Sequence, residues 1–132
     1  AIEFKGRWLH THPWRGVELV TLRELKHEGV LDEIVELSRR PALTQSQVDR
    51  FLGLPFDRSF SWDEGKLYCS ELIAKLLGIP PKPMTFASSN WERIRTADRT
   101  KVGLSPDDLM AEFQKEESRR TYSRRPLCSR IF

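Results

Sequence analysis

The sequence predicts one α+β domain in which a small antiparallel sheet packs against a helix that begins at Cys69. Short alternating β-rich segments fill the first part of the chain, and helical spacing of apolar residues dominates later. A length of 132 residues with 39% hydrophobic residues suits a single core. We therefore expect the domain over residues 1–117, followed by a basic tail over 118–132.

The N-terminal part alternates between predicted strands and helices. Strands are expected over Ala1–Lys5 and Val17–Thr21, where β-rich and polar residues alternate. The intervening Gly6–Arg15 is expected to form a loop or hairpin tip. Leu22–Glu28 has the composition of a helix, which the following glycine ends. A further strand is expected over Glu33–Leu37.

A second helix is marked by the capping-box pattern of Thr44–Gln47 and is expected to end at Gly53. Residues 56–66 are polar and aromatic and predict a loop that leads into the helix beginning at Cys69. Residues 80–90 are proline-rich and predicted to be irregular, and Trp91–Ile94 is expected to form a short strand or turn.

The last helix has a strong start signal. Ser105 supplies a cap, Pro106 occupies the first position, and Asp107 and Asp108 place acids in the first turn. We expect this helix to end at about Glu117.

The charge of +3 is unevenly distributed. Ser118–Phe132 holds five arginines and no acid, whereas the rest of the chain has 17 basic and 19 acidic residues. Such a tail could bind nucleic acid or another anionic surface, or simply be solvated, and the second interpretation is favoured because ordered aromatic spacing is missing. No apolar run reaches the roughly 18–20 residues of a membrane span. No signal peptide is visible, which favours a cytoplasmic protein.

Cys69 is the first candidate for a catalytic residue. Leu72, Ile73, Leu76 and Leu77 follow it at helical spacing, and Gly78 stops the helix. Unpaired N–H groups and the dipole at a helix N-terminus favour a thiolate, which is the nucleophile of cysteine hydrolases. The alternative is a small, buried and inert cysteine. No disulfide between Cys69 and Cys128 is expected.

Three motifs around Cys69 follow one another with a specific spacing: Leu52–Asp57 (LGLPFD), Phe60–Asp63 (FSWD) and Leu67–Leu72 (LYCSEL). The chain thereby resembles the circularly permuted branch of the NlpC/p60 papain-like cysteine hydrolases, the YiiX/YebB-like group. The similarity extends to Ile2–Phe4, Arg15–Val17 and Leu104–Leu109. It implies a permuted papain-like fold.

The resemblance also implies site roles. Cys69 would be the nucleophile, and Glu3 would orient the catalytic histidine. Tyr68 flanks the site, where its hydroxyl or the Cys69 backbone N–H could stabilise an oxyanion. The family's histidine lies in an "S/T-H-x-G" strand that should precede Glu3, and no position from Ala1 onward matches it. A missing N-terminal segment, a complementing chain and a loss of catalysis are the alternatives, and the start of the sequence inside a strand favours the first.

Three acids near the motifs are expected to support loops rather than to react. Asp57 and Asp63 are predicted to fold the connecting loop through side-chain-to-backbone bonds. Glu71 follows Cys69 by two positions on the helix, so it faces elsewhere and is expected to bind a loop N–H or to act as a first-turn acid.

The positions of the three histidines in the sequence do not predict a metal site. His10 and His12 alternate as strand residues and should share a face, but no nearby cysteine or carboxylate completes a ligand set. His27 lies on a polar helix face and should be solvated. No cofactor is expected. The four tryptophans are expected in the core more often than in a groove: Trp8, Trp14, Trp62 and Trp91.

The resemblance thus implies a thiol hydrolase, an amidase or peptidase acting through an acyl-enzyme on Cys69, on cell-wall peptides or other acyl-amides. The alternative is a non-catalytic binding domain of the same fold, which lacks the histidine and uses the arginine-rich tail for an anionic partner.

Overall fold

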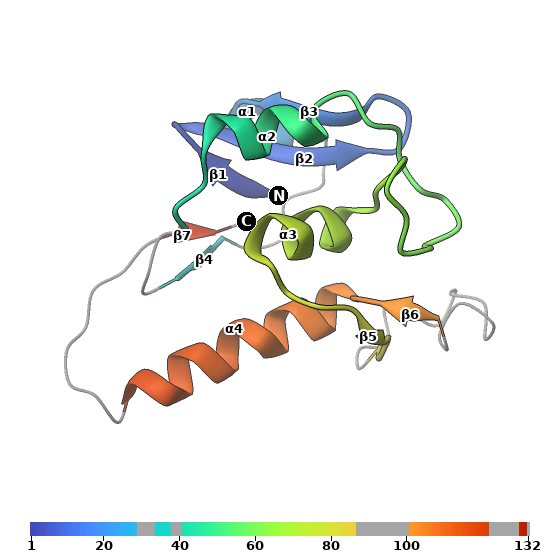
Figure 1. Ribbon diagram of the computed structural model, residues 1–132. Coiled ribbons are helices and arrows are strands. Elements are labelled where there is room, and N and C mark those ends of the chain that lie inside the picture. Colours follow the sequence, from blue (N-terminus) through green and yellow to red (C-terminus); the bar gives the residue numbers. More distant parts are fainter. Residues whose placement is uncertain (29–33, 38–40, 87–100, 122–129, 132) are drawn as a thin grey trace.

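The computed structural model shows a mixed α+β protein and describes residues 1–28, 34–37, 41–86, 101–121 and 130–131. A three-stranded sheet and helix α3 form the centre, and the long helix α4 lies beyond α3 (Figure 1). This arrangement confirms the expected class, a small antiparallel sheet packed against the helix that carries Cys69. Within the described residues, no helix is long and apolar enough to cross a membrane.

The sheet is a meander of β1 (Ile2–Phe4), β2 (Arg7–His12) and β3 (Gly16–Val20), with both neighbouring pairs antiparallel. The expectation of a loop over residues 6–15 is therefore wrong, because most of that segment is strand β2. Lys5 and Gly6 have φ of 50° and 77°, so a two-residue turn joins Phe4 to Arg7 directly. Pro13 and Trp14 mark only the second turn.

The two faces of the sheet pack against different helices. Ile2, Phe4, Leu9 and Val17 join the main core with residues of α3 (Cys69–Leu77). Trp8 and Val20, on the other face, pack around Leu25 of α1 (Leu22–His27). This division follows from the alternation of side chains along a strand, and it decides which residues can face Cys69.

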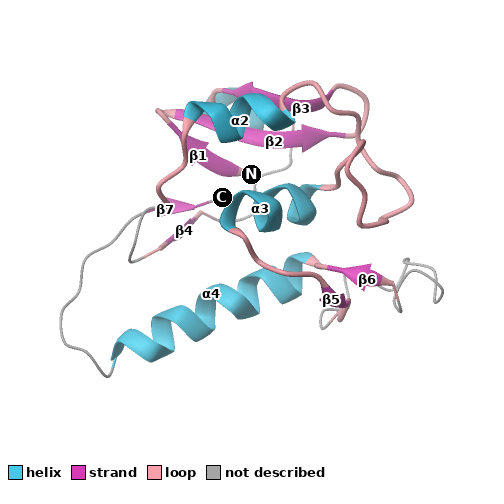
Figure 2. Cartoon of the chain, in the orientation of Figure 1, coloured by secondary structure: helices cyan, strands magenta, loops and turns pink. Residues whose placement is uncertain are grey.

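Two predicted helix starts are confirmed, one expected from a capping box and one from the spacing of apolar residues. Thr44 caps α2 (Gln45–Phe51) and exchanges bonds with Gln47. Helix α3 begins at Cys69 and ends at Gly78, whose φ of 68° suits glycine. Helices are cyan in Figure 2, where a long loop leads from α2 into α3.

The last helix is longer than expected. Helix α4 (Pro106–Thr121) starts after Ser105 as predicted but continues past Glu117 into the segment predicted to be a tail. Two short pairs complete the described structure: β4 (Val35–Glu36) with β7 (Arg130–Ile131), and β5 (Lys82–Pro83) with β6 (Val102–Gly103). The predicted Trp91–Ile94 element lies outside the described residues.

The segment that follows α2 is hydrogen-bonded to the start of β3, next to Gly16. Val17 N donates to Leu54 O at 2.8 Å, and Gly53 N donates to Val17 O at 2.9 Å. Gly16 has φ of 73°, and a Cβ there would lie 2.2 Å from the Leu54 oxygen. Both the backbone conformation and the close approach therefore require glycine.

We expect Gly16→Ala to lower the free energy of unfolding by about 3 kcal/mol or more, because it adds a left-handed alanine and a backbone clash. Urea denaturation measures the change. Gly53→Ala is the matched control, since Gly53 has φ of 82° but nothing within 4 Å of its Cβ position. It should cost only the conformational part, about 1–2 kcal/mol. Equal losses in the two variants would contradict the clash.

Candidate functional site

Cys69 is the first residue of α3, and its side chain is exposed. Tyr68 precedes it in an extended conformation, so the helix begins abruptly at the cysteine. The free amide groups of a helix N-terminus surround this position. An accessible thiol therefore stands where a developing negative charge is favoured.

The residues on either side of Cys69 hold one backbone position near α4. Leu104 N donates to Tyr68 Oη at 2.9 Å, and Ser70 Oγ donates to Leu104 O at 2.6 Å. Tyr68 and Ser70 are both buried. These two bonds turn the neighbours of Cys69 inward and fix the start of α3 against the segment that leads into α4.

The expected oxyanion role of the Tyr68 hydroxyl does not fit this geometry. The hydroxyl is buried beneath Gly103, accepts from Leu104 N and lies 4.0 Å from Met84 Sδ. Burial raises the pKa of Tyr68 above its ordinary value. Of the two expected oxyanion donors, the Cys69 backbone N–H is the one that this geometry does not exclude, and its role stays a prediction.

Glu71 is buried and organises the approach to the helix. Its carboxylate accepts from Asp63 N at 3.1 Å and from Tyr68 N at 3.3 Å, and Lys75 Nζ lies 2.9 Å away. Burial raises the pKa of Glu71, and the Lys75 ammonium opposes that rise. Asp63 Oδ1 accepts from Gly65 N at 2.9 Å, which tightens the same loop.

Asp57 closes the earlier part of the loop. Its buried carboxylate accepts from Ser59 N at 2.8 Å, and from Ser61 N and Ser61 Oγ at 2.6 and 2.7 Å. Lys66 Nζ lies 3.4 Å from it. Burial alone would raise the pKa of Asp57, but these hydrogen bonds outweigh burial and lower it. The contacts of Asp57, Asp63 and Glu71 are those of loop-supporting residues.

Glu3 does not take the position that an orienting residue needs. It pairs with Trp8 across the strands, on the face that α1 covers, whereas Ile2 and Phe4 face the main core. In the described part of the chain, no hydrogen bond or ion pair joins Glu3 to Cys69. The orienting role of Glu3 stays a prediction that this placement does not support.

The beginning of β1 lies near the segment that leads into α3. The Ala1 amino group is buried, which lowers its pKa, and it interacts electrostatically with Cys69. The same group acts on the pKa of His10. The strand register gives the same placement: β1 pairs with β2 just before Thr11, whose Oγ donates to Leu67 O at 3.3 Å, two residues ahead of Cys69.

His10 and His12 share a face of β2, as expected, with ring centroids 6.2 Å apart. They alternate with Leu9 and Thr11, so they face away from α3. His10 Nε2 lies 2.9 Å from Glu18 Oε1. Burial lowers the pKa of His10, although Glu18 opposes this. His27 is exposed, as expected.

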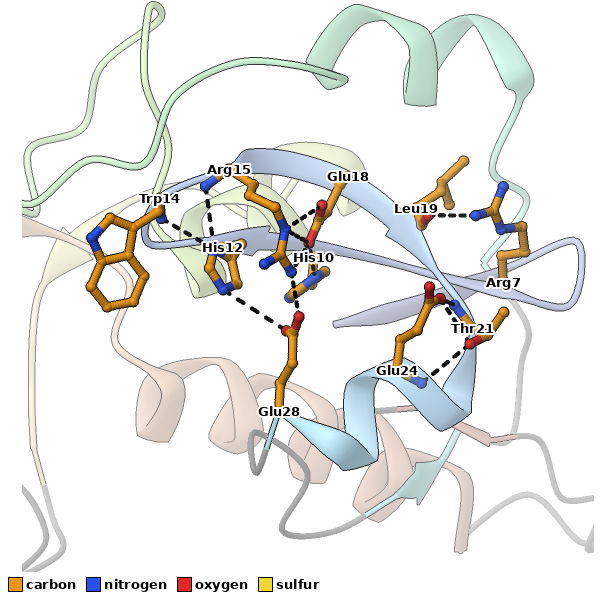
Figure 3. A network of polar contacts seen from close by, with 10 residues as sticks. All are labelled: Arg7, His10, His12, Trp14, Arg15, Glu18, Leu19, Thr21, Glu24 and Glu28. Carbon is orange, nitrogen blue, oxygen red and sulfur yellow. Dashed lines mark hydrogen bonds and ion pairs between the residues drawn. The ribbon is translucent and has the colours of Figure 1, made fainter.

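The expectation that no carboxylate lies near this pair is wrong. Figure 3 shows Arg15 between the carboxylates of Glu18 and Glu28, with His12 turned toward Glu28. Arg15 Nη2 lies 2.7 Å from Glu18 Oε1 and also bonds to Glu28, and the first contact lowers the pKa of Glu18. The pairing of His10 with Glu18 on β3 would have been visible had β2 been predicted as a strand.

The tryptophans divide between core and surface. Trp8 is buried, as expected, whereas Trp14 is 80% exposed, with the Arg58 guanidinium 5.5 Å from its ring. Trp62 is half-buried beneath Lys75. Trp91 and Cys128 lie outside the described residues.

No protein-family model, curated protein or solved structure matches this chain.

We expect Tyr68→Phe to lower the free energy of unfolding by about 1–3 kcal/mol, because the buried Leu104 N–H loses its acceptor. Denaturant unfolding measures this loss. The rate at which iodoacetamide alkylates Cys69 should stay within about twofold of the wild type, since the ring still packs. Unchanged stability with a much slower alkylation would instead place the hydroxyl at the thiol.

Asp57→Asn should lower the free energy of unfolding by about 2 kcal/mol at pH 7, because three charge-assisted bonds to serines are weakened. The lowered pKa of Asp57 means that its carboxylate stabilises the fold above the unfolded-state pKa of about 3.9. This contribution disappears as pH falls through the folded-state pKa, so wild type and variant should converge in acid.

Urea titrations from neutral to acidic pH test the convergence. Asp49→Asn, at an exposed position of α2, is the control and should change stability by less than about 0.5 kcal/mol. A gap between wild type and Asp57→Asn that is constant with pH would contradict the role of the charge.

Proposed function

We propose that this chain is a thiol hydrolase, an amidase or peptidase of the permuted NlpC/p60 type, that works through an acyl-enzyme on Cys69. The observation that carries the proposal is the exposed Cys69 at the first position of α3, a helix that packs on the sheet. The residues next to Cys69 are buried, so the thiol is the accessible group at this helix end.

The loop contacts support the same function. The motifs that carry the resemblance contain Asp57 and Glu71, and both are fully buried acids that bind the backbone of the loop before Cys69. A nucleophile needs this kind of support, since small displacements of a reacting group cost large factors in rate. Helix α3 also packs on an antiparallel sheet, as a papain-like site requires.

The reaction follows from the thiol. The Cys69 thiolate attacks the amide carbonyl, and the carbonyl oxygen becomes an oxyanion near the Cys69 backbone N–H. Collapse of this intermediate breaks the C–N bond, and the amine leaves with a proton that the base took from the thiol. Water then attacks the thioester, gives up a proton to the base and releases the acid.

Among the described residues, no catalytic base lies beside Cys69. His10 and His12 face α1 and are engaged with Glu18 and Glu28. An extension of β1 in register would pair with Thr11, whose Oγ donates to Leu67 O just before Cys69, and this supports a histidine that approaches along such an extension, either in the same chain or from another one. Without such a group, the fold would serve as a binding domain.

Amide hydrolysis by three proteins tests the proposal: the chain as given, the chain extended ahead of Ala1 by a strand with the family's Ser-His pair, and the extended Cys69→Ala variant. The substrates are acyl-peptides with fluorogenic amide leaving groups. The extended chain should be faster than the short one by about 10²–10⁴-fold, because it regains general acid–base assistance. Cys69→Ala should abolish turnover.

Two controls sharpen this comparison. Replacing the added histidine by alanine should return the rate to that of the short chain, and Cys128→Ser should leave the extended chain unchanged. Equal rates for the short and extended chains would contradict the missing-base argument and favour His10 or His12. Absence of Cys69-dependent turnover in every form would favour the binding domain.

A further inference from the structure

A second group of polar side chains lies on the face of the sheet away from α3. His10 of β2, Glu18 of β3 and Glu28 at the end of α1 each offer one ligand atom, and these atoms lie within 4.8 Å of one another. His10 is 4% exposed, so its ring is held firmly by the surrounding structure. Three separate elements thus converge on one point.

His12 adds a fourth donor to this cluster. Its Nε2 lies 4.0 Å from Glu28 Oε2. Its Nδ1 accepts from Trp14 N and Arg15 N at 3.1 and 3.2 Å, which turns Nε2 toward Glu28. Figure 3 shows both imidazoles directed toward the two carboxylates. His12 lies outside the group of three atoms within 4.8 Å but next to its member Glu28, so it is the nearest candidate for a fourth ligand.

A positive charge already occupies the cluster. The Arg15 guanidinium bonds to Glu18 and Glu28, so it neutralises two carboxylates that would otherwise repel each other. The Arg15 side chain is 48% exposed and stands in the turn between β2 and β3, where it has room to rotate into solvent. The two carboxylates therefore favour a cation between them, and a metal ion would meet the same need as arginine.

We propose that His10, His12, Glu18 and Glu28 form a site for a divalent transition metal such as Zn²⁺, which enters as Arg15 swings out. Imidazole and carboxylate are Zn²⁺ ligands, whereas Ca²⁺ and Mg²⁺ prefer sets of oxygens. Ligand atoms around tetrahedral Zn²⁺ are about 3.3–3.5 Å apart, given bonds of about 2.0–2.1 Å. The ligand atoms of His10, Glu18 and Glu28 lie within 4.8 Å of one another, so side-chain rotations that close them by up to about 1.5 Å would reach this geometry, with His12 moving in beside Glu28.

The site would be structural. It lies between the hairpin and the end of α1, on the side opposite the packing of α3, and its residues have no role in the proposed hydrolysis. Bound metal would join α1 to β2 and β3 through side chains alone.

Calorimetric titration with Zn²⁺ and the visible spectrum of Co²⁺ test the site. A Cys69→Ser/Cys128→Ser background is needed, because thiolates also bind both ions. We expect one equivalent of metal, a tetrahedral Co²⁺ spectrum and a higher melting temperature with Zn²⁺. Glu28→Gln should weaken binding by more than the roughly tenfold typical of losing an outer-sphere partner.

Arg15→Ala should change the affinity for Zn²⁺ in the opposite direction to Glu28→Gln. Removing the competing cation should tighten Zn²⁺ binding by about tenfold, since the metal no longer has to displace two ion pairs. Arg23→Ala, at an exposed position of the same α1 helix, should leave binding unchanged. Circular dichroism of each variant without metal checks that it is folded.

No uptake of Zn²⁺ by either the background protein or Arg15→Ala would overturn the proposal and define the cluster as an ion-pair network. Binding that is insensitive to Glu28→Gln in a folded variant would overturn it as well. Weaker binding in Arg15→Ala would show that arginine supports the site rather than competes for it, which contradicts the exchange.

Discussion

The buried carboxylate of Glu71 is the contact on which the geometry around Cys69 depends. A carboxylate at zero exposure is costly unless it is paired, and here Lys75 supplies the charge while Asp63 N and Tyr68 N supply hydrogen bonds. The same group thus caps the helix and holds the preceding loop. Because these bonds share one carboxylate, the loop cannot move without disturbing the first turn of α3.

The other side of the first turn of α3 is fixed by hydrogen bonds to the backbone of Leu104 rather than by an ion pair. Tyr68 and Ser70 bind the N–H and the carbonyl of Leu104, so the segment before α4 acts as a short partner for the start of α3. Asp108, buried in the first turn of α4, secures that segment through Ser105 N and Thr85 N. Cys69 is left as the exposed residue between two anchored neighbours.

Features encoded by neighbouring residues could be predicted from the sequence. The capping box of Thr44 and the helix from Cys69 to Gly78 depend on local spacing and local turn chemistry. Strand β2 could not be predicted in the same way. It pairs with β1 through the two-residue Lys5–Gly6 turn, and the residues of this turn do not by themselves indicate a hairpin. The cluster of His10 with Glu18, and the inward direction of the Tyr68 hydroxyl, depend on strand register and on α4, which are set by tertiary packing.

The connectivity of the strands has a consequence for how the chain folds. The β1–β2–β3 meander closes over turns of a few residues, so its loop-closure entropy is small. The β4–β7 pair instead joins Val35 to Ile131 and encloses most of the chain. Loop-closure entropy grows with the length of chain enclosed, so the β4–β7 pair is the costlier of the two to close and depends more on the packing around it.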